Sequence, residues 1–202
     1  MSLEYLEREG ITNGRVLAAM RSVPRDRFVP ESARALADEN RPLSIGHGQT
    51  ISQPYIVAYM TQALAIRSGD RVLEVGTGSG YQCAILAELA GWVYTVEVIP
   101  ALAERARALL GELGYTNVSL RVGDGAEGWA DHAPYDGIIV TAAPADVPPV
   151  LVEQLDCGGR MILPVGPVGG YQELVMILKD DSGKVSRKRL LPVRFVPLTH
   201  GT

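Results

Sequence analysis

The stretch that most constrains this chain is VLEVGTGSGYQ at residues 72–82, followed by WVYTVEV, which ends on Glu97. An apolar run ending in a glycine turn, a helix, and a second apolar run ending in an acid are typical of a βαβ unit that binds a nucleoside. Gly76 and Gly78 allow a tight turn and let the backbone approach a ligand without an intervening Cβ. Glu97 can accept hydrogen bonds from both hydroxyls of a ribose.

The spacing of the glycines indicates which nucleoside is bound. A dinucleotide fingerprint would need glycine at position 81, where this chain has Tyr81. Gly76, Gly78 and Gly80 instead form a G-x-G-x-G turn that resembles S-adenosylmethionine-dependent methyltransferases. Alone, the glycines could make only a tight turn, and Glu97 could be a solvated acid at a strand end. Their common register favours a cofactor site, and we predict S-adenosylmethionine as the cofactor, with Ser79 as a further contact.

Alternating apolar runs and helical patterns predict the fold. We expect strands at 71–75, 92–97, 118–122, 135–141 and 159–164, with helices at about 80–90, 100–113 and 147–155. This order implies right-handed crossovers and an α/β fold with a doubly wound, mainly parallel sheet, the Rossmann-like methyltransferase fold. Ligands bind at the carboxyl ends of such strands, where Gly76, Glu97, Asp124 and Thr141 are all expected.

The flanking segments follow other patterns. A helix carrying Val16 to Val23 should begin at an Asn13 cap and end before Pro24, a short helix is expected at 31–38, and PLSIGHGQT should be a loop. The C-terminal apolar runs around a DSGK turn predict an antiparallel hairpin reaching Leu198. We therefore expect one domain over 1–202, with a helical cap and TISQP loop at 1–68, a cofactor-binding core at 69–166 and C-terminal strands at 167–202.

Four further segments narrow the prediction. GHGQTISQP at 46–54, VTAAP at 140–144, GGRMILPVG at 158–166 and RFVPL at 194–198, together with the glycine turn, resemble the protein-L-isoaspartate O-methyltransferase family. The resemblance runs from about Val16 to Leu198. Asp38, Asn40 and Cys157 depart from the family pattern, outside the cofactor motif.

The resemblance implies roles for residues that the pattern alone leaves open. It places Ser52 in the active site, although a serine just before Pro54 is also what a helix N-cap demands. It places Thr50 toward the cofactor and the loop of Asp124 and Gly125 at the adenine, although Asp-Gly could be a plain turn. His47, His132 and His200 show no metal-ligand spacing, and we assign them no catalytic role.

The resemblance also implies a reaction. The acceptor is the free α-carboxylate of an isoaspartyl residue in a damaged protein or peptide, and its methyl ester would close to a succinimide whose hydrolysis returns some normal aspartate. A carboxylate with a pKa near 4 is already ionised at neutral pH, so transfer needs positioning and no general base. A small-molecule methyltransferase and a noncatalytic binding protein are the alternatives, and TISQP argues against the first.

Composition excludes other classes of function. The net charge is −4 with scattered basic residues, so no nucleic-acid footprint is seen, and no apolar run reaches the length of a membrane span. The two cysteines, Cys83 in a helix and Cys157 in a loop, have no disulfide or metal pattern and suggest reduced thiols in a cytoplasmic protein. The oligomeric state stays open, with a monomer as the working assumption.

Overall fold

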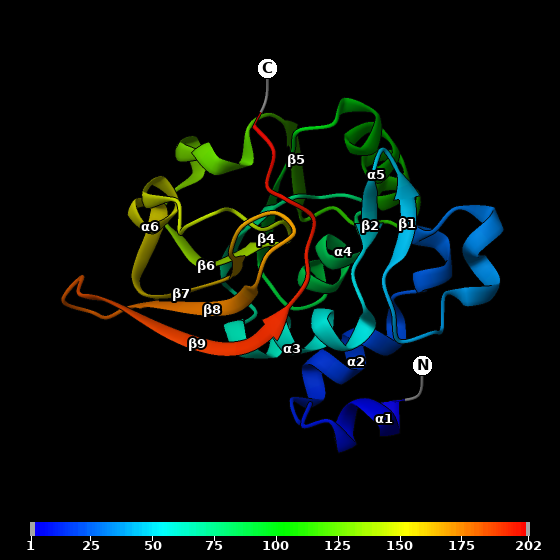
Figure 1. Cartoon of the computed structure of the whole chain (residues 1–202), viewed down its shortest axis with the longest axis horizontal. Helices are drawn as coiled ribbons and strands as arrows, with labels where there is room; N and C mark the ends of the chain where they lie inside the picture. The colour runs from blue at the N-terminus through cyan, green and yellow to red at the C-terminus, as the bar shows by residue number, and fades with distance from the viewer. Residues whose placement is uncertain (1–2, 201–202) are drawn as a thin grey trace.

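A seven-stranded sheet forms the centre of the molecule in a computed structural model that describes residues 3–200 (Figure 1). The strand order is β5-β4-β3-β6-β7-β8-β9. The first five strands in this order run parallel, and β8 and β9 are antiparallel to their neighbours. The bounds are β3 Arg71–Val75, β4 Trp92–Glu97, β5 Val118–Val122, β6 Tyr135–Val140, β7 Leu155–Val165, β8 Gln172–Lys179 and β9 Val185–Val193. The predicted mainly parallel sheet with an antiparallel C-terminal hairpin is confirmed.

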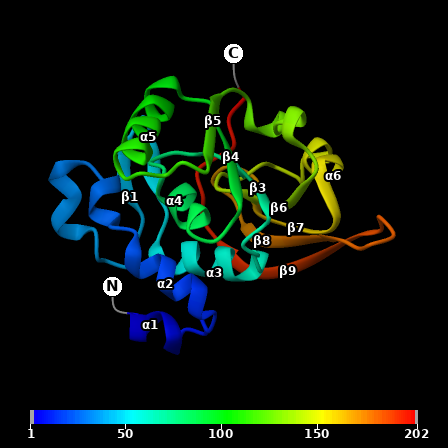
Figure 2. The same cartoon turned by 180° about the vertical axis from the view of Figure 1, so that it is seen from behind.

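Helices cover both faces of this sheet (Figures 1 and 2). The apolar residues of β3, β4, β6, β7 and β8 contribute to two cores, one shared with α2 to α5 and the other with α6. Buried strands with apolar residues on both faces are expected for a parallel sheet between helical layers. The helices are α1 Leu3–Arg8, α2 Gly14–Ser22, α3 Pro54–Leu64, α4 Tyr81–Ala87, α5 Pro100–Glu112 and α6 Pro149–Gln154, with 3₁₀ turns η1 Arg25–Phe28, η2 Glu31–Leu36, η3 Gly125–Glu127 and η4 Ala130–His132.

The order of the strands creates a crevice at the carboxyl ends of the central strands. Strand β3 lies between β4 and β6, so the connections leaving β3 and β6 go to opposite faces. Such a reversal leaves an open crevice beyond the carboxyl ends of the two strands. The glycine turn of residues 76–80 follows β3 and therefore lies at this crevice.

The helix α2 begins and ends where the sequence predicts. The Asn13 carboxamide oxygen accepts hydrogen bonds from the backbone amides of Arg15 and Val16, which starts α2. The helix ends at Ser22, one residue before the extended Val23, because Pro24 disfavours a helical conformation at the residue before it. The helix predicted at 31–38 is instead a 3₁₀ helix, η2.

The loop prediction for PLSIGHGQT is wrong. Residues Leu43–Gly46 (β1) and Gln49–Ile51 (β2) form an antiparallel hairpin, in which Leu43 pairs with Ile51 and Ser44 with Thr50. Leu43, Ile45 and Ile51 are buried, so the hairpin has an apolar face against the helical cap. The turn residues GHG interrupt this short alternation, which is why the sequence pattern suggested a loop.

The loop predicted around Cys157 is also wrong. Strand β7 begins at Leu155, directly after α6, and includes Cys157. Leu155 pairs with Tyr135 of β6, and Lys179 of β8 donates a hydrogen bond to the Leu155 carbonyl at 2.7 Å. Tertiary contacts from β6 and β8 thus extend the strand beyond its apolar stretch.

The C-terminal hairpin ends earlier than predicted, at Val193. Residues 194–200 continue from the end of β9 toward the C-terminus (Figure 1, red), and Pro197 forms a parallel bridge with Ala143, which follows β6. The Ala143 amide donates to the Val196 carbonyl and the Leu198 amide donates to the Ala143 carbonyl, so this segment is fixed at the crevice. Within residues 3–200, no helix has the length and apolarity needed to span a bilayer.

Candidate active site

A cavity lies at the carboxyl ends of β3, β4 and β6, and we call it the glycine-turn cavity. Seven of the predicted site residues line it, namely Thr50, Ser52, Gly76, Gly78, Ser79, Glu97 and Gly125. They come from β2 and the residue after it, the glycine turn, the end of β4 and the start of η3. The tertiary structure therefore gathers segments that are more than 70 residues apart in the chain.

Gly76 makes the sharp turn that opens this cavity. Its φ is +93°, and a Cβ added there would lie 2.5 Å from the Thr141 hydroxyl oxygen. That hydroxyl donates at 2.6 Å to the Gly76 carbonyl, with the Val75 carbonyl at 3.1 Å, so it cannot move away without losing hydrogen bonds. Only glycine satisfies both the backbone conformation and the packing at this position.

Glu97 organises the glycine turn from the end of β4. One carboxylate oxygen accepts a hydrogen bond from the Gly78 amide at 2.7 Å, and the other accepts one from the Ile99 amide at 3.0 Å. The side chain is buried. A carboxylate has about four acceptor sites, so two backbone bonds leave capacity for the two hydroxyls of a ribose. Glu97 is therefore not the solvated acid at a strand end that the sequence pattern left open.

The residues around the cavity suit a nucleoside with an amino-acid group. The glycine turn lets a ligand approach the backbone, Glu97 offers acceptors, and Thr50 and Ser79 offer hydroxyls. Apolar side chains, including Ile99, complete the wall. S-adenosylmethionine is a nucleoside that carries an amino-acid group, so these lining residues fit the predicted cofactor.

A buried polar network lies directly under the glycine turn. The Thr95 hydroxyl donates to Glu74 at 2.6 Å and lies 2.6 Å from the Thr77 hydroxyl. Glu74 is fully buried, and desolvation raises its pKa to about 8, opposed by hydrogen bonds from Thr95 and Cys83 and assisted by the charge of Glu97. Burial likewise raises the pKa of the Cys83 thiol. Glu74 therefore carries its proton at neutral pH and supports the turn as a neutral hydrogen-bonding group.

Ser52 lies in the wall between the glycine-turn cavity and a second one. This outer cavity has a volume of about 430 Å³ and is lined by Thr50, Ser52, Thr141, Arg194 and Phe195 among others. The N-cap of α3 is Gln53, which makes no side-chain capping bond, so the capping role considered for Ser52 is wrong. The Ser52 hydroxyl makes no hydrogen bond within residues 3–200 and is available to a ligand.

Asn40 supplies the cap that Ser52 does not. Its side-chain oxygen accepts a hydrogen bond from the Tyr55 amide in the first turn of α3 at 3.1 Å. This residue is one of the departures from the family pattern noted above. Sequence spacing could not reveal the cap because Asn40 is 15 residues before Tyr55.

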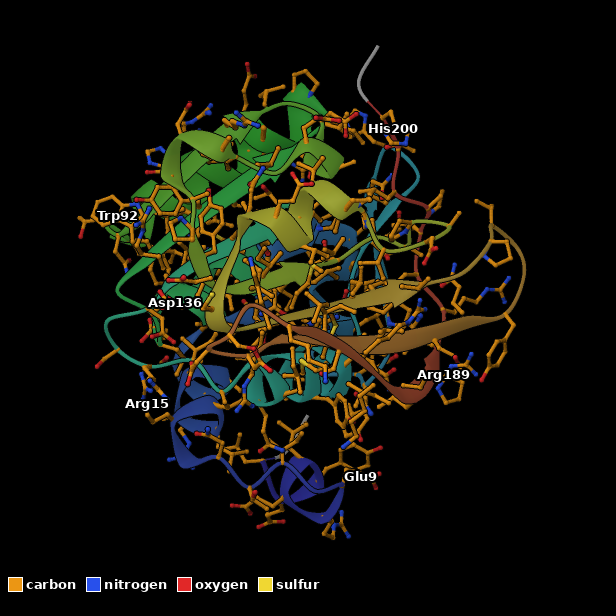
Figure 3. The ribbon with its side chains drawn as sticks, turned by 90° about the vertical axis from the view of Figure 1, so that its left-hand side faces the viewer. Glu9, Arg15, Trp92, Asp136, Arg189 and His200 are labelled. Carbon is orange, nitrogen blue, oxygen red and sulfur yellow. The ribbon has the colours of Figure 1, made fainter. Side chains whose placement is uncertain are left out.

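Two predicted site residues lie beside the cavity without lining it. Gly80, with φ +87°, is the N-cap residue of α4. Asp124 caps η3 through the Ala126 amide, and its other oxygen lies 2.9 Å from Nδ1 of His200. His200 is at the end of the C-terminal segment, at the surface of the molecule (Figure 3). The sequence had suggested no contact for this histidine.

The C-terminal segment contributes walls to which the sequence assigned no role. Residues 196–199 line the glycine-turn cavity, and residues 192–196 line the outer cavity. Buried Gln172 fixes them, because its carboxamide accepts from the Phe195 amide at 2.7 Å and donates to the Phe195 carbonyl at 3.2 Å. RFVPL at 194–198 was one of the segments that carried the family resemblance, but only the folded structure shows that it borders the two cavities.

Known proteins resemble the chain over nearly its whole length. The family model described as protein-L-isoaspartate(D-aspartate) O-methyltransferase matches residues 2–202. Protein-L-isoaspartate O-methyltransferase 2 of Syntrophobacter fumaroxidans is 58% identical over 187 residues, covering 93% of this chain and 76% of the relative.

Two solved structures agree with this match. A protein-L-isoaspartate O-methyltransferase superposes with a TM-score of 0.88 at 29% identity, and the alignment covers 96% of this chain but 64% of that one. A beta-aspartate methyltransferase from Plasmodium falciparum, in complex with S-adenosyl-L-homocysteine, gives 0.85 at 26% identity and covers 98% and 96% of the two chains. The chain belongs to the protein-L-isoaspartate(D-aspartate) O-methyltransferase family.

Proposed function

We propose that the chain transfers a methyl group from S-adenosylmethionine to the free α-carboxylate of L-isoaspartyl residues in damaged proteins and peptides. One observation carries the proposal: Thr50 and Ser52 belong to the walls of both the glycine-turn cavity and the outer cavity. A methyl donor in the first and a carboxylate in the second can therefore meet at these two residues. The family match supports the same assignment.

Residues of the glycine-turn cavity would hold the donor. Glu97 would accept from the ribose hydroxyls, the backbone of residues 76–79 would follow the amino-acid group, and the loop of Asp124 and Gly125 would border the adenine. When bound, S-adenosylmethionine supplies an electrophilic methyl group on a positively charged sulfur. The chain's own contribution is to orient that group and to exclude water from it.

The outer cavity would hold the acceptor. An isoaspartyl α-carboxylate is ionised well below neutral pH, so its oxygen can attack without a general base. The Ser52 hydroxyl, which is otherwise unbonded within the described chain, would donate a hydrogen bond that fixes one carboxylate oxygen. In this proposal Ser52 contacts the reacting group and is the catalytic residue.

We further expect a monomer that works in the cytoplasm and binds no nucleic acid. An exposed free thiol at Cys157 is compatible with a reducing compartment. A methyltransferase acting on a small molecule is the main alternative, since the glycine turn and Glu97 would serve it equally well.

Three matched peptides test the proposal. They share one sequence and carry L-isoaspartate, normal L-aspartate, or L-isoaspartate whose α-carboxylate is blocked as the amide. Only the first should accept a radiolabelled methyl group. A pocket whose donors pair with one carboxylate leaves them unpaired with the other two peptides, which can discriminate by ~10⁴-fold. Equal labelling of the aspartyl peptide, or labelling of the blocked one, would overturn the assignment.

A further inference from the structure

Arg25 is a buried cation in the N-terminal cap, and the function proposed above assigns it no role. It is the first residue of η1 and is 7% exposed. One terminal nitrogen donates to the Ala37 carbonyl, and the other donates to the carbonyls of Arg41 at 3.2 Å and Ser52 at 3.1 Å. A single guanidinium thus joins the segment after η2 to the residue between the two cavities.

This arrangement is costly for stability alone. The guanidinium has carbonyl oxygens as hydrogen-bond partners and lies over the Tyr81 ring at 5.9 Å, but it forms no ion pair within residues 3–200, and its Nε has no hydrogen-bond partner there. Desolvation lowers the pKa of Arg25, and the interactions with Tyr81 and Asp38 only partly oppose this shift. Taking a cation out of water costs several kcal/mol, and an apolar side chain often fills such a site at lower cost. The arginine therefore needs a reason beyond packing.

The Ser52 carbonyl supplies that reason. Its bond to Arg25 is the one hydrogen bond that the Ser52 backbone makes within the described chain. The same guanidinium holds Ala37 and Arg41, on either side of Asn40, which caps the helix that follows Ser52. Arg25 consequently fixes Ser52 directly and, through Asn40, fixes the start of α3.

We propose that Arg25 is a positioning residue for methyl transfer, which sets the Ser52 hydroxyl against the reacting carboxylate by holding the Ser52 carbonyl. The inference rests on the function proposed above. A rigid, planar fork can hold several carbonyls in one fixed geometry, whereas the ammonium of lysine is a point charge on a flexible stem. A lysine at this position would keep the charge and lose the geometry.

The test compares Arg25→Lys, Ser52→Ala and the double variant with the wild type. Arg34→Lys is the matched control, because Arg34 is an exposed arginine of the same cap. The readouts are kcat on an isoaspartyl peptide at saturating substrates and the Kd for S-adenosylhomocysteine from calorimetry. Arg25→Lys should lower kcat by at least ~10-fold, since a displacement of ~1 Å can cost ~100-fold, and should change the Kd by less than ~3-fold. Arg34→Lys should match the wild type in both.

The double variant distinguishes positioning from a general structural effect. If Arg25 acts through Ser52, adding Arg25→Lys to Ser52→Ala should lower kcat by less than ~3-fold more. Independent, multiplicative losses, or an unchanged kcat in Arg25→Lys, would overturn the inference. An unchanged kcat in Ser52→Ala alone would instead overturn the role proposed for Ser52. If Arg25→Lys fails to bind S-adenosylhomocysteine, the neutral Arg25→Gln, which buries no charge, takes its place in the same cycle.

Discussion

Replacing Glu74 by glutamine should flatten the dependence of stability on pH. Burial raises the pKa of Glu74 from its ordinary value of 4.5 to about 8, with Thr95 and Cys83 opposing the rise and Glu97 adding to it. Between these two values the folded chain keeps a proton that the unfolded chain releases. The free energy of unfolding therefore falls as pH rises through this range, by about 1.4 kcal/mol per pH unit for one proton. The contribution of Glu74 to the free energy of unfolding is therefore complete below about pH 4.5 and is lost as the pH rises toward 8.

Glutamine cannot titrate, so Glu74→Gln removes this component. Between pH 5.5 and 7.5 the variant should gain about 2–3 kcal/mol relative to the wild type, as measured by urea unfolding at each pH with equal m-values. The two proteins are identical at every other position, so the contribution of the rest of the chain cancels in the difference. Parallel stability curves for the two proteins would show that Glu74 is ionised in the folded chain, and the reasoning from burial would be wrong.

Three further experiments test the site. Glu97→Ala should weaken S-adenosylhomocysteine binding by about 1.5–3 kcal/mol in calorimetry through lost charge-assisted hydrogen bonds, whereas Glu104→Ala on the exposed face of α5 should bind normally; equal affinities would contradict the placement of Glu97. Ser52→Ala should lower kcat at nearly constant thermal stability, while Asn40→Ala should cost about 1 kcal/mol of stability, and the reverse pattern would restore the capping role to Ser52. Gly76→Ala should abolish cofactor binding and destabilise the chain by about 1–3 kcal/mol, since its Cβ would meet the Thr141 hydroxyl at a positive φ; full binding in this variant would refute the close-packed turn.

The local pattern determined the core of the sheet and the glycine turn of residues 76–80. Strands 71–75, 92–97 and 118–122 were predicted with the bounds that the structure shows. Fully buried parallel strands need continuous apolar residues, and a turn at φ +93° needs glycine. Both features depend on residues that are adjacent in the sequence, so a local pattern can predict them. Asn13 was likewise a readable cap, because it bonds to amides only two and three residues away.

Contacts between distant segments decided the rest. The hairpin at 43–51 depends on burying Leu43 and Ile51 against the cap, and the early start of β7 depends on pairing with Tyr135. The family resemblance pointed to Ser52, but that its carbonyl is held by Arg25 from 27 residues away follows only from the folded chain. A hydrogen bond between such segments leaves no periodicity or spacing in the sequence, because each partner is chosen by its position in space. The amino-acid order alone therefore determined the parallel sheet and the glycine turn, and the tertiary structure alone decided what surrounds Ser52.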